Sequence, residues 1–145
     1  MDMEFDVVRG RVGRLRALMR QNGLDALAVM VFERLNSESC HYISGFRGSS
    51  AALVIDAARE LLITDGRYQT QAALQSPFAL VVQSGLPISE YVAKTVAENG
   101  YKTVGYEAEK VFCGVFETSL KKVRVEWKDA STLIPSLRRC KDATE

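Results

Sequence analysis

One histidine limits the acid–base and nucleophilic chemistry of this chain of 145 residues. A Ser-His-Asp or Cys-His system needs its imidazole beside a nucleophile, with a third group to orient the ring. Cys40 directly precedes His41, and we interpret residues 41–44 as a short strand, in which neighbouring side chains point to opposite faces. Cys40 and His41 are therefore not expected to meet as nucleophile and base. We interpret His41 as a packed or surface residue.

Three carboxylates at the ends of a predicted hairpin, Asp56, Glu60 and Asp65, are the best candidates for a metal site. Hard cations accept ligand sets made only of oxygen atoms. Turns, however, favour acidic residues for conformational reasons, and water solvates them there. We therefore expect these carboxylates to be structural. A stand-alone metal-dependent hydrolase built on them is kept as a minor hypothesis.

The segment of residues 45–50 is the candidate binding loop. Gly45 and Gly48 permit unusual backbone angles, and we expect Phe46 and Arg47 to project an aromatic face and a planar cation outward. The segment leads into a strand, so it lacks the following helix whose N-terminus would bind a phosphate. A binding loop and a simple turn both remain open.

A second turn, Asp65-Gly66-Arg67-Tyr68, joins a predicted strand to a predicted helix. Asp65 can cap the helix, and Arg67 can return to pair with a carboxylate, so we favour a structural role for this turn. Trp127 is interpreted as a core or interface residue. The remaining candidates are the arginines of the first helix, which we interpret as a solvated face: Arg9, Arg11, Arg14, Arg16 and Arg20.

The composition argues against several classes of partner. With 19 basic and 18 acidic residues the net charge is +1, whereas nucleic acids and anionic membranes normally need a basic face. The apolar runs have the length of strands, and residues 1–6 lack the basic region of a signal peptide. Three cysteines without a C-x-x-C pair suggest neither a disulfide framework nor a zinc ribbon. We expect a cytoplasmic protein.

The elements that must position these residues alternate between helices and strands. Apolar residues at steps of three and four predict a helix over residues 5–19, which Asn22-Gly23 ends, and residues 24–32 are predicted to form a buried strand. The other predicted elements are strands at 41–44, 51–55, 61–64, 78–83, 103–107 and 123–127, and helices at 68–74, 88–98, 110–122 and from 133. Because a hairpin interrupts the strand-helix-strand units, this order predicts an α/β domain with a mixed β-sheet flanked by helices.

Three stretches occur in a characteristic order: Arg-Leu-Arg-Ala-Leu-Met (14–19) with Asn-Gly-Leu-Asp-Ala-Leu (22–27), then His-Tyr-Ile-Ser-Gly-Phe-Arg-Gly-Ser-Ser (41–50), then Leu-Ile-Thr-Asp-Gly-Arg-Tyr (62–68). Together they resemble the N-terminal domain of the creatinase/prolidase family, which includes Xaa-Pro aminopeptidases and Xaa-Pro dipeptidases. The resemblance implies a ribonuclease-H-like mixed sheet over residues 1–135. It also implies that residues 136–145 begin a linker helix to a C-terminal catalytic domain that this chain does not include.

In this family the catalytic domain holds two divalent metal ions, expected to be Mn, Co or Zn, on two aspartates, a histidine and two glutamates. The resemblance therefore implies that this chain contains no catalytic residue, no metal ligand and no cofactor. It implies an auxiliary role in a homodimer, in which Phe46 and Arg47 reach the rim of the partner subunit's active-site cleft. Arg47 is suited to the carboxylate of a peptide substrate. The alternative is a protein- or peptide-binding module of a non-peptidase relative.

Overall fold

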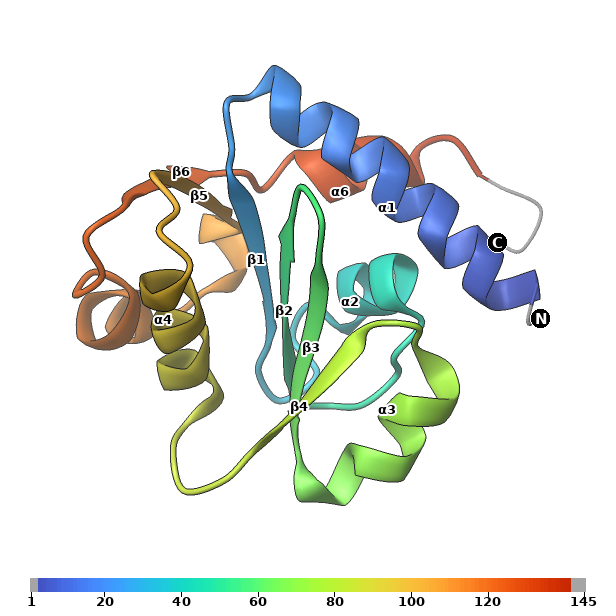
Figure 1. Ribbon diagram of the computed structural model, residues 1–145, viewed down its shortest axis with the longest axis horizontal. Coiled ribbons are helices and arrows are strands. Elements are labelled where there is room, and N and C mark those ends of the chain that lie inside the picture. The colour runs from blue at the N-terminus through green and yellow to red at the C-terminus, as the bar shows by residue number, and fades with distance from the viewer. Residues whose placement is uncertain (1–2, 142–145) are drawn as a thin grey trace.

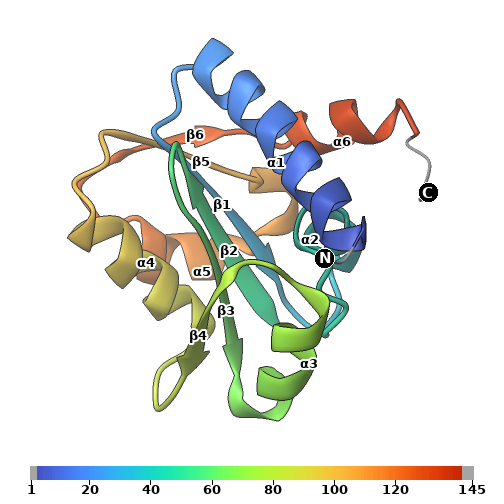
Figure 2. The ribbon, with the colours of Figure 1, turned by 45° about the vertical axis from the view of Figure 1, so that its right-hand side comes forward.

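The computed structural model describes residues 3–141, which form a mixed sheet with helices on both faces (Figures 1 and 2). The strands are β1 (Ala26–Val31), β2 (Ala51–Asp56), β3 (Glu60–Asp65), β4 (Ala79–Gln83), β5 (Thr103–Tyr106) and β6 (Glu126–Asp129). The helices are α1 (Met3–Gln21), α2 (Ser37–Ser44), α3 (Gln69–Gln75), α4 (Ile88–Glu98), α5 (Cys113–Val115) and α6 (Leu133–Arg138). Short helical turns are η1 (Gly66–Tyr68), η2 (Ala108–Lys110) and the π-helical η3 (Phe116–Leu120).

The sheet has the strand order β4-β3-β2-β1-β5-β6. The hairpin strand β2 pairs antiparallel with both β1 and β3, whereas β1 with β5, β5 with β6, and β3 with β4 are parallel. This arrangement confirms the predicted hairpin and the predicted mixed α/β sheet flanked by helices. None of the helices within residues 3–141 combines the length and hydropathy needed to cross a membrane.

Strand β1 is buried along its whole length and separates two hydrophobic clusters. Because side chains alternate across a strand, Leu27, Val29 and Val31 pack on one face of the sheet, and Ala26, Ala28 and Met30 pack on the other. The first cluster includes residues of α1, α2 and α6, and the second includes residues of α4 and Leu120. The helices therefore cover opposite faces, as Figure 1 shows for α1 and α4.

The first helix confirms the predicted amphipathic pattern. Its core positions are Val8, Val12, Leu15 and Met19. At its end Gly23 takes a φ of 68°, a left-handed conformation that glycine adopts without strain. The N–H of Leu24 then donates to the carbonyl of Met19 (2.9 Å), which closes the helix in the manner of a left-handed cap.

Residues 41–44 are helical, so the strand predicted there is wrong. They form the second half of α2, which begins at Ser37 within a segment that we expected to be a loop. Cys40 and Ile43 are buried one helical turn apart. Gly45, with a φ of 83°, closes the helix by donating its N–H to the carbonyl of His41 (2.8 Å). A segment of four residues is too short for its pattern to distinguish a strand from a helix.

Two predictions in the C-terminal third also need correction. The helix expected over residues 110–122 consists only of α5 and η3, and the strand expected from residue 123 begins at Glu126. The alternation of Val123 and Val125 reflects their packing against the α4 side of the core rather than strand pairing. Of the linker helix expected over residues 136–145, the first three residues end α6, and residues 142–145 lie outside the described part of the chain.

Candidate functional site

The loop of residues 45–50 is held rigidly between α2 and β2. A Cβ atom on Gly45 would overlap the backbone carbonyl of Gln75, so this position needs glycine for space as well as for its left-handed backbone. The N–H of Phe46 donates to Ser44 Oγ (3.1 Å), and Thr64 Oγ1 donates to the carbonyl of Ser50 (2.8 Å). The loop is therefore tied at both of its ends.

The side chain of Phe46 is fully buried, so the expectation that it projects outward is wrong. Its ring packs edge-on against Tyr68, with ring centroids 5.6 Å apart. A Cβ atom on Gly48 would overlap the ring of Phe46. The loop therefore packs against the buried ring of its own Phe46, and this contact holds the backbone of the loop in place.

Arg47, in contrast, is exposed, as expected. Its backbone N–H donates to Gln75 Oε1 (3.0 Å), so the main chain beneath the side chain is fixed. Within residues 3–141 the structure gives the Arg47 guanidinium neither a hydrogen bond nor an ion pair. This guanidinium is therefore available to an external anion.

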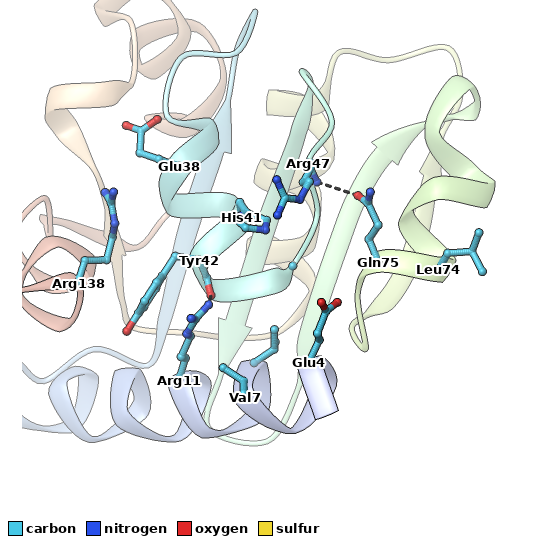
Figure 3. A pocket seen from close by; sticks show the side chains of 12 residues that line it. Glu4, Val7, Arg11, Glu38, His41, Tyr42, Arg47, Leu74, Gln75 and Arg138 are labelled. Atoms are coloured by element: carbon cyan, nitrogen blue, oxygen red, sulfur yellow. Dashed lines mark hydrogen bonds between the residues drawn. The ribbon is translucent and has the colours of Figure 1, made fainter. Parts of the chain in front are cut away.

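Arg47 lies between two hollows in the surface. The larger, of about 490 Å³, opens between α1 and α2 (Figure 3), and its polar lining includes Arg11, His41, Tyr42, Gln75 and Arg138. The smaller, of about 260 Å³, is lined on its polar side by Arg34, Ser37, Ser49, Tyr68 and Gln71. The loop therefore presents a cation, unpaired within the described part of the chain, to two neighbouring cavities.

The arginines of α1 do not all lie on a solvated face, which corrects that interpretation. Arg11 is only 6% exposed; it donates to the carbonyl of Tyr42 (2.9 Å) and stacks over the Tyr42 ring at 4.2 Å. Arg16 is half-buried, donates to the carbonyl of Asp56 (2.8 Å) and forms an ion pair with Glu60. The exposed arginines of the helix are Arg9, Arg14 and Arg20.

His41 and Cys40 lie in different environments. His41 is half-buried, and its side chain lies near Arg47 in the larger cavity (Figure 3). Burial lowers the pKa of His41, and the charges of Arg47 and Arg11 lower it further, against an opposing effect of Glu4. Cys40 is fully buried; burial raises the pKa of its thiol to about 12, so it is not a nucleophile at neutral pH.

The carboxylates proposed for a metal site are engaged with cations instead. Asp56 forms an ion pair with Arg59, Glu60 pairs with Arg16, and Asp65 lies at the opposite end of β3 from Glu60. Within residues 3–141 no group of three or more His, Cys, Asp or Glu residues could hold a metal ion. The stand-alone hydrolase hypothesis therefore has no geometric support in the described residues.

The turn of residues 65–68 is connected to the loop. Asp65 accepts hydrogen bonds from the backbone N–H of Arg67 (3.0 Å) and from its side-chain Nε (2.9 Å), which lowers the pKa of the Asp65 carboxyl. Asp65 caps η1, and α3 begins one residue later than the predicted helix. The hydroxyl groups of Tyr68 and Ser49 lie 2.5 Å apart, so the turn supports the loop.

Sequence reasoning missed Arg34 and Gln75 as neighbours of Arg47. Both are distant from the loop in the sequence, and the fold alone brings them to it. The segment before α2 carries positive φ angles at Glu33 (49°), Arg34 (70°) and Asn36 (75°). Asparagine tolerates this region, but glutamate and arginine rarely adopt it unless the surroundings impose it. No local spacing in the sequence signals this conformation.

Comparisons with known proteins agree with this fold. The creatinase/prolidase N-terminal domain family matches residues 11–140. The probable Xaa-Pro aminopeptidase P of Arthroderma otae is 36% identical over 108 residues, which cover 67% of this chain and 17% of that protein. The chain spans less than a third of the length of the curated relatives that it matches.

Two solved structures are similar over most of the chain. The X-Pro aminopeptidase of Thermotoga maritima has a TM-score of 0.82 and 30% identity over 92% of this chain and 37% of that one. The N-terminal domain of the cytoplasmic peptidase PepQ of Mycobacterium tuberculosis has a TM-score of 0.76 and 31% identity over 89% of this chain and 98% of that one. The six-stranded mixed sheet with its flanking helices therefore defines an N-terminal domain of the Xaa-Pro peptidase type. The chain belongs to the creatinase/prolidase N-terminal domain family.

Proposed function

We propose that this chain is the non-catalytic N-terminal domain of a cytoplasmic Xaa-Pro metallopeptidase, in which it supports homodimer formation and shapes the active-site cleft of the partner subunit. Its family membership and its relatives' names favour this role over a binding module of a non-peptidase relative. The observation that carries the proposal is the exposed, unpaired guanidinium of Arg47 on a loop whose backbone is fixed.

In this proposal Arg47 borders the partner's cleft and binds the carboxylate of a peptide substrate, and Phe46 holds the loop in place from the core. An arginine presents two parallel N–H groups to a carboxylate, which gives orientation as well as binding energy. A fixed backbone lowers the conformational entropy lost when the side chain binds. Phe46 is thus a positioning residue, and Arg47 is the one that would contact the substrate.

The two divalent ions of the proposed enzyme, expected to be Mn, Co or Zn, belong to its catalytic domain. The residues that the structure describes do not fit such a pair, because Asp56, Glu60 and Asp65 are each paired with an arginine and no group of three or more His, Cys, Asp or Glu residues among them could hold a metal ion. Metal-activated water would be supplied by the catalytic domain. This domain would determine which peptides reach that water.

Steady-state kinetics of the full-length enzyme test the role of Arg47. Arg47→Ala should raise KM for a Xaa-Pro peptide by about tenfold with little change in kcat, because a charge-assisted contact outside the reacting centre is lost. Arg67→Ala is the matched control, since the Arg67 guanidinium is already paired with Asp65. An unchanged KM for Arg47→Ala would show that the loop is only a turn.

Mixed dimers test whether Arg47 acts on the partner subunit. One subunit carries Arg47→Ala with an intact catalytic domain, and the other carries Arg47 with an inactivated catalytic domain. If Arg47 acts across the dimer, this pair has the normal KM, because the only active cleft faces an intact Arg47. A raised KM would place Arg47 at its own subunit's cleft, and a monomeric enzyme in sedimentation analysis would contradict dimerisation.

A further inference from the structure

The larger cavity between α1 and α2 has the size and the lining of a ligand site. Its volume of about 490 Å³ lies within the range of roughly 300–1,000 Å³ that small-molecule sites occupy. Four helices and the loop supply its walls: Val7 and Val8 come from α1, Tyr42 from α2, Leu74 from α3, Arg138 from α6 and Arg47 from the loop. Polar groups therefore face the cavity beside an apolar wall (Figure 3).

Two arginines line this cavity, and the structure fixes the guanidinium of Arg11 and the backbone of Arg47. The guanidinium of Arg11 is fixed by its hydrogen bond to the carbonyl of Tyr42 and by stacking on the Tyr42 ring. Arg47 extends from a backbone that Gln75 Oε1 holds. Because that amide oxygen already accepts from Arg47 and from Gln71 Nε2 (3.2 Å), the Gln75 NH₂ group is oriented as a donor beside Arg47.

The charge of the lining selects the kind of anion. The charged residues that line the cavity are Arg11, Arg47, Arg138, Glu4 and Glu38. Three arginines and two glutamates give a net charge of +1 when His41 is neutral. A monoanion matches this charge, whereas a phosphate dianion would face the two glutamates with an excess negative charge. The apolar wall from Val7 and Val8 favours an aliphatic body on the ligand.

We propose that the cavity between α1 and α2 binds a monocarboxylate with a short aliphatic body, with the carboxylate held by the Arg47 guanidinium and the Gln75 NH₂ group and the body against Val7 and Val8. This site lies beside the smaller cavity. The proposal does not depend on the proposed peptidase function. A free aliphatic acid and the end of a peptide chain share this chemistry.

His41 provides a direct reporter of occupancy, because it is the only histidine of the chain and its ring resonances need no assignment. The charged groups that line the cavity together with His41 are Glu4 and Arg11 on α1, Glu38 on its own helix, Arg47 on the loop and Arg138 on α6. A carboxylate bound at Arg47 compensates the positive charge that disfavours the imidazolium form. The pKa of His41 should therefore rise when the cavity fills.

The test is an NMR titration of the 145-residue chain with 4-methylpentanoate, as a free acid, and with N-acetyl-leucine, as a chain end. Saturable shifts of the His41 ring resonances and a raised His41 pKa are expected for at least one of them. The compound that binds more tightly shows whether the site prefers a free acid or the end of a peptide chain. The neutral 4-methylpentanamide and inorganic phosphate should bind at least about tenfold more weakly, because the first lacks the charge and the second exceeds it.

Arg47→Gln should weaken binding of the better carboxylate by about tenfold, because it removes a charge-assisted donor from the site. Arg20→Gln, which makes the same change in net charge at the exposed end of α1, should leave the affinity unchanged. The proposal is overturned if neither carboxylate gives a saturable shift, if the amide or phosphate binds as tightly, or if both variants behave alike. None of these outcomes depends on peptidase activity.

Discussion

The ring of Phe46 lies against Gly48, two residues further along the chain, and it occupies the space that a Cβ atom at position 48 would need. Arg47 stands between these two residues and points away from the core. The loop therefore exposes a cation because its neighbouring aromatic side chain is buried beneath it. This relationship makes the position of Arg47 depend on the absence of a side chain at Gly48.

Gly48→Ala should lower the free energy of unfolding by about 1–3 kcal/mol, because the added methyl group forces the buried ring out of its position. Urea denaturation measures the effect. Gly66→Ala is the matched control, since a Cβ built there meets no described residue within 4 Å apart from its own local backbone, and its φ is not positive. Equal stability of the two variants would contradict the packing described for Phe46.

Asp56 should make stability depend on pH in the acid range. Burial alone would raise its pKa, but hydrogen bonds from Tyr101, Ala58 and Arg59 outweigh burial and hold the pKa at about 2, below the ordinary 3.8. Its contribution of about 2 kcal/mol is therefore present above pH 3.8 and is lost as the pH falls through about 2. In urea unfolding from pH 5 to pH 2, Asp56→Asn should show a smaller loss of stability than the unsubstituted chain. Parallel curves would refute this role.

Glu107 should make the free energy of unfolding fall as the pH rises, which is opposite to the effect of Asp56. It is 2% exposed, and burial raises its pKa to about 7, although Asn36 Nδ2 donates to its carboxylate (2.7 Å). Because the folded state holds the proton more tightly, stability should fall as the pH rises from about 4.5 to about 7.

Glu107→Gln removes this cost and supplies a donor for the side-chain oxygen of Asn36, which has no hydrogen-bond partner among residues 3–141. The variant should be about 2–3 kcal/mol more stable than the unsubstituted chain at pH 8, with the gain shrinking toward pH 5. Thermal or urea unfolding at the two pH values measures this difference. Glu109→Gln, at an exposed neighbouring position, should show no such gain. A gain that is the same at both pH values would argue against titration of Glu107.

The cysteines should separate into two classes in thiol labelling. Cys113 and Cys140 are exposed, whereas Cys40 is buried with its pKa raised to about 12. Ellman's reagent should therefore modify two thiols rapidly in the folded chain and the third only after unfolding. Rapid modification of all three would show that Cys40 is accessible and would contradict the packing of α2.

The elements with long periodic patterns could be predicted from the sequence. The α4 helix has the predicted bounds 88–98, and the hairpin of β2 and β3 was predicted from two apolar runs around a polar turn. The α2 helix could not be predicted in this way, because it has few apolar residues. Its end depends on Gly45, and a glycine in the left-handed conformation is equally compatible with the end of a helix and with a turn.

The candidate site could be predicted only in part. The exposure of Arg47 follows from a polar residue between two glycines, but the burial of Phe46 depends on Tyr68 and Gly48 and is a tertiary effect. The burial of Arg11 was missed for a related reason. The sequence pattern places Arg11 on the solvated face of α1. In the fold, Tyr42 of α2 packs over Arg11, accepts a hydrogen bond from it through its carbonyl and stacks its ring on the guanidinium.

The side chains of β1 alternate between the two faces of the sheet, and this limits where the domain tolerates insertions and deletions. Small residues, Ala26 and Ala28, face α4, and larger ones, Leu27 and Val29, face α1. Removing one residue from β1 would exchange these two sets, leaving voids on one side and steric overlap on the other. Changes in length are therefore best accommodated outside this strand, for example near the exposed Leu86 between β4 and α4, where added residues would extend into solvent.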